Sequence, residues 1–225
     1  MPALPTNIMY MIGKTVAFSN EDVRKINTIK DIFRAKMGDF DEELPRFITD
    51  YLKDGIIAGG AFASMWHHEE PNDWDFYFNN GDTMLKFQSL MNDTIPSSVP
   101  MNYDMNPGAV TFECGLQIIT KWTANHRVYF DFIHCLPYYD YNKDELYISP
   151  QQLDSIKRKE LIKNPILKST PTVTRVEKFL DRGWTISTEV IPSPIPTADY
   201  LAEGDLRVCA DGRIEVFANG QWICP

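Results

Sequence analysis

The sequence predicts a mixed α/β (α+β) fold, in which helices flank a mixed sheet and a small C-terminal β-hairpin appendage follows. Segments with helical spacing alternate with short apolar and aromatic runs through the first 190 residues, as in sheets covered by helices. The 225 residues are 44% hydrophobic and 12% aromatic, enough to bury one sizeable core. Near the end, Asp211-Gly212 separates two short apolar runs and is a strong hairpin signal.

Helices are expected where apolar residues recur at three- and four-residue intervals. Residues 19–53 show this spacing, and Ser19 is the expected N-cap. Gly38 starts a break that predicts two helices in this region, the second over residues 42–52. Further helices are predicted over residues 61–67, 83–91, 149–164 and 172–182.

Strands are expected where β-branched and aromatic residues form short runs. Such runs cover residues 55–58, 73–78, 109–112, 116–120 and 127–134, and the hairpin adds residues 204–209 and 213–217. Ile191-Pro-Ser-Pro-Ile-Pro predicts an extended linker punctuated by prolines. The predicted organisation is a main domain over residues 1–190, a linker over 191–203 and a β-hairpin appendage over 204–225.

Charge and hydropathy exclude two classes of protein. The formal charge is −9, and residues 1–156 hold 12 Lys/Arg against 22 Asp/Glu, which opposes a general nucleic-acid coat. Residues 157–182 reverse the sign with 8 against 3, so a local phosphate contact stays open. No uncharged stretch reaches the about twenty residues of a membrane span, so an integral membrane protein is not expected.

The cysteines and the start of the chain predict a protein of a reducing compartment. The first residues lack a basic segment before a long apolar run, so no signal peptide is expected. The four cysteines form no Cys-x-x-Cys pair and, with the histidines, match no zinc template. We therefore expect buried free thiols, and Cys209–Cys224 across the hairpin is the one disulfide considered.

Glycines and paired carboxylates suggest a site for phosphate and metal. Gly59-Gly60 lies between a predicted strand and helix, with Ser64 four residues on, where backbone N–H groups can approach a phosphate. A simple turn is the alternative. Asp73 and Asp75 project from one face of a strand, and a hard cation such as Mg²⁺ would relieve their repulsion. The alternative is that one Asp caps a helix and the other faces solvent.

Asp131 stands in an apolar run, where a carboxylate has to be paired, hydrogen-bonded or metal-bound. Pairing with His134 or an arginine is the alternative to a third metal ligand. Three carboxylates would form a two-ion Mg²⁺ site that activates a hydroxyl and holds a triphosphate. Cations for the phosphates are expected in Lys157-Arg-Lys or in Arg175 and Lys178, with a solvated helix face as the alternative.

The order Gly-Gly, twelve residues, Asp-x-Asp and a later Asp resembles the polymerase-β-like nucleotidyltransferase superfamily. Ile56-Ile-Ala-Gly-Gly-Ala-Phe-Ala-Ser followed by Asn72-Asp-Trp-Asp-Phe-Tyr-Phe is similar to the head domain of tRNA CCA-adding enzymes and poly(A) polymerases. Tyr129-Phe-Asp-Phe-Ile-His-Cys, Leu146-Tyr-Ile-Ser-Pro and Arg182-Gly-Trp resemble nucleotidyltransferase-like proteins of tailed bacteriophages. The resemblance covers residues 40–185.

This resemblance implies a nucleotidyltransferase fold and a Mg²⁺-dependent transfer of NMP from an NTP to a hydroxyl acceptor. It assigns catalysis and metal binding to Asp73, Asp75 and Asp131, and nucleotide binding to Gly59, Gly60, Ser64, Arg175 and Lys178. CCA-adding enzymes carry an Arg-Asp pair where this chain has Ala63-Ser64, and their templating domain has no counterpart here, so a tRNA substrate does not follow. An RNA end, a protein and a small molecule all remain open as acceptor.

Two other functions stay open at this point. The C-terminal segment is similar to β-hairpins of tailed-phage virion proteins, with Phe217 and Trp222 as possible anchors to phage structural proteins. The chain could then be an inactive nucleotidyltransferase-fold protein that acts as a structural or adaptor component of a virion. A glycosyltransferase would also use Asp-x-Asp with a divalent cation. The expected location is the host cytoplasm or the virion.

Overall fold

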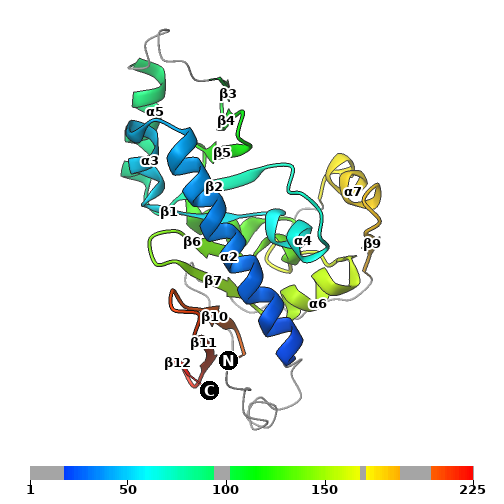
Figure 1. Ribbon diagram of the computed structural model, residues 1–225. Helices are drawn as coiled ribbons and strands as arrows, with labels where there is room; N and C mark the ends of the chain where they lie inside the picture. The colour runs from blue at the N-terminus through cyan, green and yellow to red at the C-terminus, as the bar shows by residue number, and fades with distance from the viewer. Residues whose placement is uncertain (1–17, 94–101, 168–170, 188–203, 225) are drawn as a thin grey trace.

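The computed structural model describes residues 18–93, 102–167, 171–187 and 204–224 of the chain. Its centre is a ten-stranded mixed sheet in the order β12-β11-β10-β7-β6-β1-β2-β5-β4-β3. Neighbouring strands are antiparallel except β2 and β5, which run parallel. Figure 1 shows α2 crossing this sheet and α7 standing at the opposite side from α3 and α5. The prediction of a mixed α/β fold with helices on a mixed sheet is confirmed.

The elements are as follows. The helices are α2 (Asn20–Glu43), α3 (Arg46–Leu52), α4 (Ala61–Trp66), α5 (Gly81–Asp93), α6 (Pro150–Arg158) and α7 (Val173–Leu180), with the short 3-10 helices η1 (Ala124–Tyr129) and η2 (Ile133–Cys135). The large sheet contains β1 (Gly55–Ala58), β2 (Trp74–Phe78), β3 (Tyr103–Asn106), β4 (Ala109–Phe112), β5 (Leu116–Ile119), β6 (Tyr138–Asp140), β7 (Glu145–Ile148), β10 (Leu206–Val208), β11 (Ile214–Ala218) and β12 (Gln221–Ile223). A second, two-stranded sheet pairs β8 (Glu160–Leu161) with β9 (Thr185–Ile186).

Helix α2 is longer than predicted. It begins at the expected cap, Ser19, and then continues without a break for 24 residues, so the predicted break at Gly38 is wrong. Met37 and Phe40, on either side of this glycine, are fully buried, and their packing outweighs the roughly 1 kcal/mol that a helical glycine costs. The chain turns at Pro45 instead, because proline lacks an N–H and disfavours a helical conformation in the residue before it.

Residues 127–134, predicted as a buried strand, instead form the end of η1, an extended link and the start of η2. The side-chain amide of Asn164 donates to the carbonyls of Val128 and Phe130, at 2.7 and 2.8 Å. Backbone groups that a strand would offer to its neighbour are therefore satisfied by one side chain. The apolar side chains of this segment pack on both faces of the sheet. Phe132 lies in the main core, while Phe130 also contacts a second, smaller cluster on the other face.

Two further differences concern short elements. The helix predicted over residues 149–164 ends at Arg158, because Lys159 takes a left-handed conformation with φ 48° and β8 follows directly. Strands β3, β6 and β7 lie outside the predicted set. Each is only three or four residues long and carries polar residues, so the sequence offers little apolar alternation to mark it.

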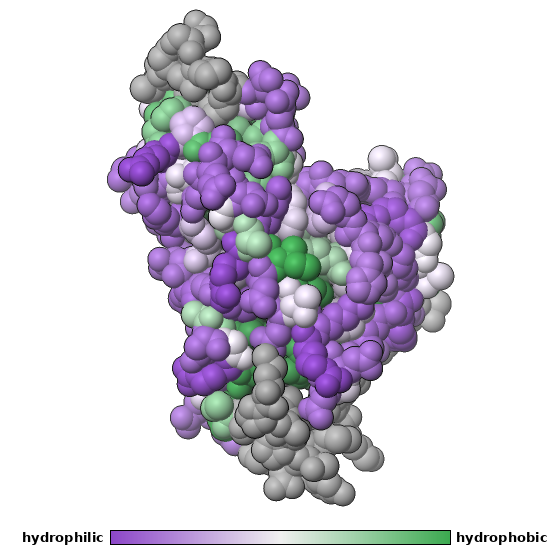
Figure 2. All heavy atoms as spheres, in the orientation of Figure 1, coloured by the Kyte–Doolittle hydropathy of each residue, from purple (hydrophilic) through white to green (hydrophobic). Residues whose placement is uncertain are grey.

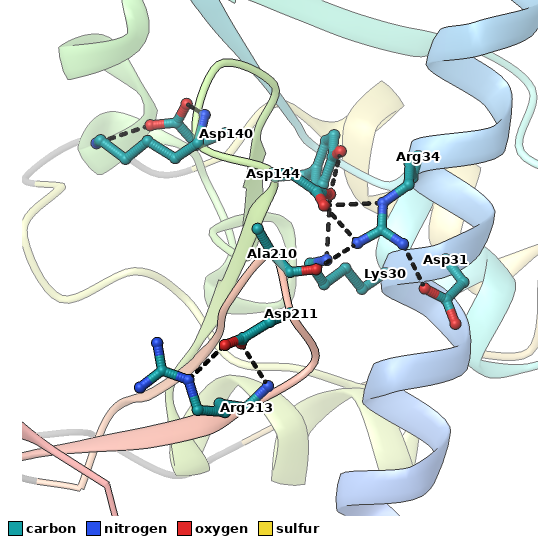
Figure 3. A network of polar contacts seen from close by, with 10 residues as sticks. Lys30, Asp31, Arg34, Asp140, Asp144, Ala210, Asp211 and Arg213 are labelled. Atoms are coloured by element: carbon teal, nitrogen blue, oxygen red, sulfur yellow. Dashed lines mark hydrogen bonds and ion pairs between the residues drawn. The ribbon is translucent and has the colours of Figure 1, made fainter.

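The C-terminal hairpin continues the main sheet, because β10 pairs antiparallel with β7. Helix α2 holds it as well: Arg34 donates to the carbonyl of Ala210 at 2.9 Å and binds Asp144, which also forms an ion pair with Lys30 (Figure 3). The predicted linker, residues 191–203, lies outside the described residues.

The structure also shows what surrounds the aromatic and cysteine side chains of the C-terminal hairpin. The Trp222 ring lies 5.4 Å from the ring of Phe217 and 5.8 Å from that of Tyr147, so it packs on its own sheet. The four cysteines are free thiols, and Cys209 and Cys224 are not bridged. Within the described part of the chain, no helix is both long and apolar enough to cross a membrane.

Candidate functional site

The site begins with the alternation of side chains along β2. Trp74, Phe76 and Phe78 face the main core below the helices. Tyr77 belongs to the smaller cluster on the other face, and Asp75 shares that face because successive strand residues alternate. The strongly apolar β2 therefore positions its carboxylate firmly, with Asp73 two residues before it at the start of the strand.

A pocket of about 280 Å³ opens where β1 turns into α4, next to β2 and α7. Seven of the eight residues that the sequence assigned to the site line it: Gly59, Gly60, Ser64, Asp73, Asp75, Arg175 and Lys178. They come from three segments, namely the β1–α4 turn with α4, the start of β2, and α7, and the fold brings these segments together. In Figure 2 the surface around α7, on the right of the view, is mainly hydrophilic.

Asp75 is the most strongly perturbed acid of the pocket. Burial first, and then the charge of Asp73, raise its pKa to about 7, although Lys178 and Arg175 act in the opposite direction. Gly59 makes room for it: with φ at 101°, a Cβ at this position would lie 2.8 Å from the Asp75 Oδ2 atom. This glycine therefore serves the carboxylate as well as the turn into α4. Two adjacent carboxylates in such surroundings favour a bound cation.

Arg182 supplies a cation next to Ser64 that was not predicted from the sequence. Its Nη2 donates to Ser64 Oγ at 2.8 Å and to Glu69 Oε2 at 2.7 Å. Glu69 also binds Lys159 Nζ at 2.6 Å, so one carboxylate fixes two cations, and these lower its pKa. The signal in the sequence was weak, since Arg182 stands more than a hundred residues after Ser64 and follows a helix rather than a glycine loop.

Asp131 reaches the site only through Arg175. The Arg175 Nε lies 2.6 Å from the Asp131 Oδ2, while Arg175 itself lines the pocket. The alternative of pairing with an arginine is therefore the arrangement observed. Among the described residues, no group of three or more His, Cys, Asp or Glu side chains is arranged to hold a metal. Asp73 and Asp75 fit one hard cation, whereas the expected three-carboxylate site is not assembled in this arrangement.

The remaining candidates lie elsewhere. Lys157 pairs with Asp22 of α2, and Arg158 with Asp154 and Glu160, so neither extends into the pocket. His134 is fully buried against the rings of Phe179 and Trp184, and burial lowers its pKa to about 3, which makes it a core residue. Pocket-lining residues that the sequence did not single out include Gln117, Phe130 and Tyr77.

One comparison with known proteins gives a match. Residues 24–159, more than half of the chain, match the model of the Gabija anti-defense 2 (Gad2) family, and the chain belongs to this family. The matched region includes β1, α4, β2 and thus both carboxylates of the pocket, but ends before α7. No curated protein and no solved structure matches the chain.

This match corrects the identification made from the motifs. The chain is not identified as a nucleotidyltransferase of the polymerase-β-like superfamily, because the family that matches is Gad2 and no nucleotidyltransferase family does. A glycine turn followed by Asp-x-Asp is a short pattern, and a strand–turn–helix unit with a polar rim can produce it without shared ancestry. The chemistry open to the chain therefore depends on the residues of the pocket itself.

Proposed function

We propose that this member of the Gad2 family, an anti-defence family related to bacteriophages, counteracts the Gabija defence through the pocket between α4, β2 and α7. The ligand proposed is a nucleoside triphosphate bound together with Mg²⁺. The reaction proposed is transfer of its nucleotidyl group to a hydroxyl. These assignments rest on the charges and geometry of the pocket, and the family contributes only the anti-defence role.

The observation that carries the proposal is the opposition of charges in one pocket. Asp73 and Asp75 lie on one wall, and Arg175, Lys178 and Arg182 contribute to the others. A ligand that brings both a divalent cation and several negative charges satisfies both walls at once. A metal complex of a triphosphate has this composition, and its negative charges would meet Lys178 as well as Arg175 and Arg182, which pair with Asp131 and Glu69 in the structure. A neutral ligand would leave the repulsion between Asp73 and Asp75 unrelieved.

The residues then have distinct roles. Asp73 and Asp75 would hold the cation, and Mg²⁺, when bound, supplies positive charge at the α-phosphate. Arg182 and Lys178 bind the negative charge of the triphosphate and of the pyrophosphate that leaves. The acceptor oxygen forms a bond to the α-phosphorus, the bond from that phosphorus to the pyrophosphate oxygen breaks, and the hydroxyl proton passes to solvent or a carboxylate. Asp131 can accept it once Arg175 turns to the phosphates.

A second candidate is a non-catalytic role, in which the pocket binds its ligand without turnover. The ion pair between Asp131 and Arg175 favours it, because this pair removes the third carboxylate from the site. The two candidates share the ligand and differ in whether pyrophosphate is released.

A measurement of nucleotide turnover distinguishes the catalytic candidate from the non-catalytic one. We expect the full chain, given an α-labelled NTP, Mg²⁺ and a mixture of RNA, protein and small hydroxyl acceptors, to release pyrophosphate and label an acceptor. Asp73→Asn should reduce this rate at least a hundredfold, because one ligand of the cation loses its charge, while Asp104→Asn, an exposed carboxylate on β3, should leave it unchanged. Binding without pyrophosphate release would support the non-catalytic candidate, and competition by a UDP-sugar alone would refute both.

Arg182 should control affinity for the nucleotide. Arg182→Ala removes a charged hydrogen-bond donor from the wall beside Ser64, which predicts a loss of nucleotide affinity of about tenfold or more. Arg24→Ala, an exposed arginine on α2, is the matched control. Isothermal titration of both variants measures the effect; equal affinities would show that Arg182 serves only the structure around Glu69.

A further inference from the structure

An exposed aromatic cluster surrounds η1, outside the pocket. Trp122 is 43% exposed and Tyr129 50%, although most large aromatic side chains of the chain are buried. The His126 ring lies between them, stacked on Trp122 with centroids 4.4 Å apart and planes 2° apart, and 5.2 Å from the Tyr129 ring. We call Trp122, His126 and Tyr129 the η1 aromatic surface.

The segment that carries this surface is positively charged, although the chain is acidic overall. Residues 114–130 contain Lys121 and Arg127 but no Asp or Glu. The Lys121 ammonium lies 4.8 Å from the centre of the Trp122 ring, and the Arg127 guanidinium 4.1 Å from that of Tyr138. Among the described residues, neither cation forms an ion pair with a carboxylate, in contrast to the paired Lys157, Lys159 and Arg182. No carboxylate therefore neutralises either charge, although Arg127 also donates a hydrogen bond to Tyr138.

The rings are suited to stacking rather than to charge recognition. Burial, together with Lys121, lowers the pKa of His126, so that its ring is neutral at pH 7 and backs Trp122 as a flat apolar partner. The flexible Lys121 side chain also lies over the Trp122 ring, and a base could displace it. An aromatic ring next to an unpaired cation offers one surface for a base and one for its phosphate.

The η1 aromatic surface and the pocket are formed by neighbouring stretches of the chain. Phe130 directly follows Tyr129, lines the pocket and packs on Tyr77 with ring centres 5.5 Å apart. Gln117, five residues before Trp122, lines the pocket as well.

We propose that the η1 aromatic surface binds single-stranded nucleic acid, with bases stacked on Trp122 and Tyr129 and phosphates on Lys121 and Arg127. A single strand is favoured over a duplex, because stacking on side chains requires bases whose faces are free. With two cations, the contact is short, which agrees with the acidic charge of the whole chain. This binding goes beyond the proposed function, since it needs neither the metal nor the carboxylates.

Fluorescence anisotropy with labelled 12-nucleotide oligo-dT and oligo-U, in EDTA and without nucleotide, tests the proposal on the full chain. We expect Trp122→Ala and Tyr129→Ala each to weaken binding about tenfold. Leu85→Ala, which removes a 58% exposed apolar side chain on α5, should have no effect. Lys121→Gln should lower the slope of log affinity against log salt by about 0.7, because one phosphate contact is lost.

Any of three results would overturn the proposal. One is the absence of binding by the unmodified chain, and another is equal binding by Trp122→Ala, by Lys121→Gln and by the Leu85→Ala control. Tighter binding of a 12-base-pair duplex would also contradict it. Because metal and nucleotide are left out, a failure here does not bear on the pocket, and a failure of turnover does not bear on the η1 aromatic surface.

Discussion

Asp75→Asn is expected to abolish stabilisation by Mg²⁺ and nucleotide while leaving the metal-free fold no less stable. The pKa of Asp75 is raised to about 7 by burial and by Asp73, above the 3.8 of an ordinary aspartate. The unfolded chain therefore loses this proton more readily, so the ionised group opposes folding as pH rises from about 4 to 7. At pH 8 asparagine removes that unfavourable charge and, with it, a ligand of the cation.

Thermal unfolding at pH 8 measures both parts of this prediction. At a nucleotide concentration 100 times its Kd, with Mg²⁺ in excess, binding adds about 2.7 kcal/mol to the stability of the unmodified chain, or about 5–10 °C in Tm for a domain of this size. Asp75→Asn should show no shift in Tm on addition of the ligand, whereas the control Asp104→Asn should show the full shift. A variant that is much less stable without ligand would mean that Asp75 is a structural residue; one that still shifts would place the cation elsewhere.

Asp144→Asn is expected to destabilise the fold by about 3 kcal/mol. Asp144 lies 3.1 Å from the ammonium of Lys30, whose side chain is only 2% exposed, and accepts from Tyr139 at 2.7 Å (Figure 3). Removing one partner of a buried pair leaves the other charged and unpaired. Asparagine suits the left-handed backbone of this residue, with φ at 52°, so the substitution tests the charge and not the turn.

Urea unfolding gives this change in free energy, with Asp154→Asn as control. Asp154 belongs to an exposed pair with Arg158 on α6, so its loss should leave the stability almost unchanged. The pKa of Asp144 is lowered, because hydrogen bonds from Arg34, Tyr139 and Lys30 outweigh its burial. Its contribution is therefore present at neutral pH and lost as the pH falls through the lowered pKa. Equal effects of the two substitutions would contradict this account of the network.

The sequence predicted correctly those elements whose conformation depends on residues close to them in the chain. The N-cap Ser19, the Gly59-Gly60 turn and the aromatic β2 were all predicted, because each depends on neighbours within a few residues. The failures have distant causes. The residues after η1 are not a strand because Asn164 satisfies their carbonyls, and Gly38 does not end α2 because the residues beside it are anchored in the core. Neither fact can be read from the segment itself.

In the candidate site, too, only the contacts between residues close in the sequence could be predicted. Strand alternation was enough to pair Asp73 with Asp75, and the turn placed Gly59 beside them. The Arg182–Ser64 contact and the ion pair of Arg175 with Asp131 depend on where α7 folds back, which no short-range pattern encodes. The motif that suggested a known superfamily described the shape of one strand–turn–helix unit correctly, but shape alone did not identify the family.

Isothermal titration of the full chain with each NTP, in the presence of Mg²⁺ and then of EDTA, tests the central claim most directly. The claim is that the pocket between α4, β2 and α7 binds a nucleotide together with a divalent cation. We predict saturable one-to-one binding with Mg²⁺ that is lost in EDTA and in Asp75→Asn. Absence of heat with all four NTPs, or binding that is equal with and without the metal, would contradict it.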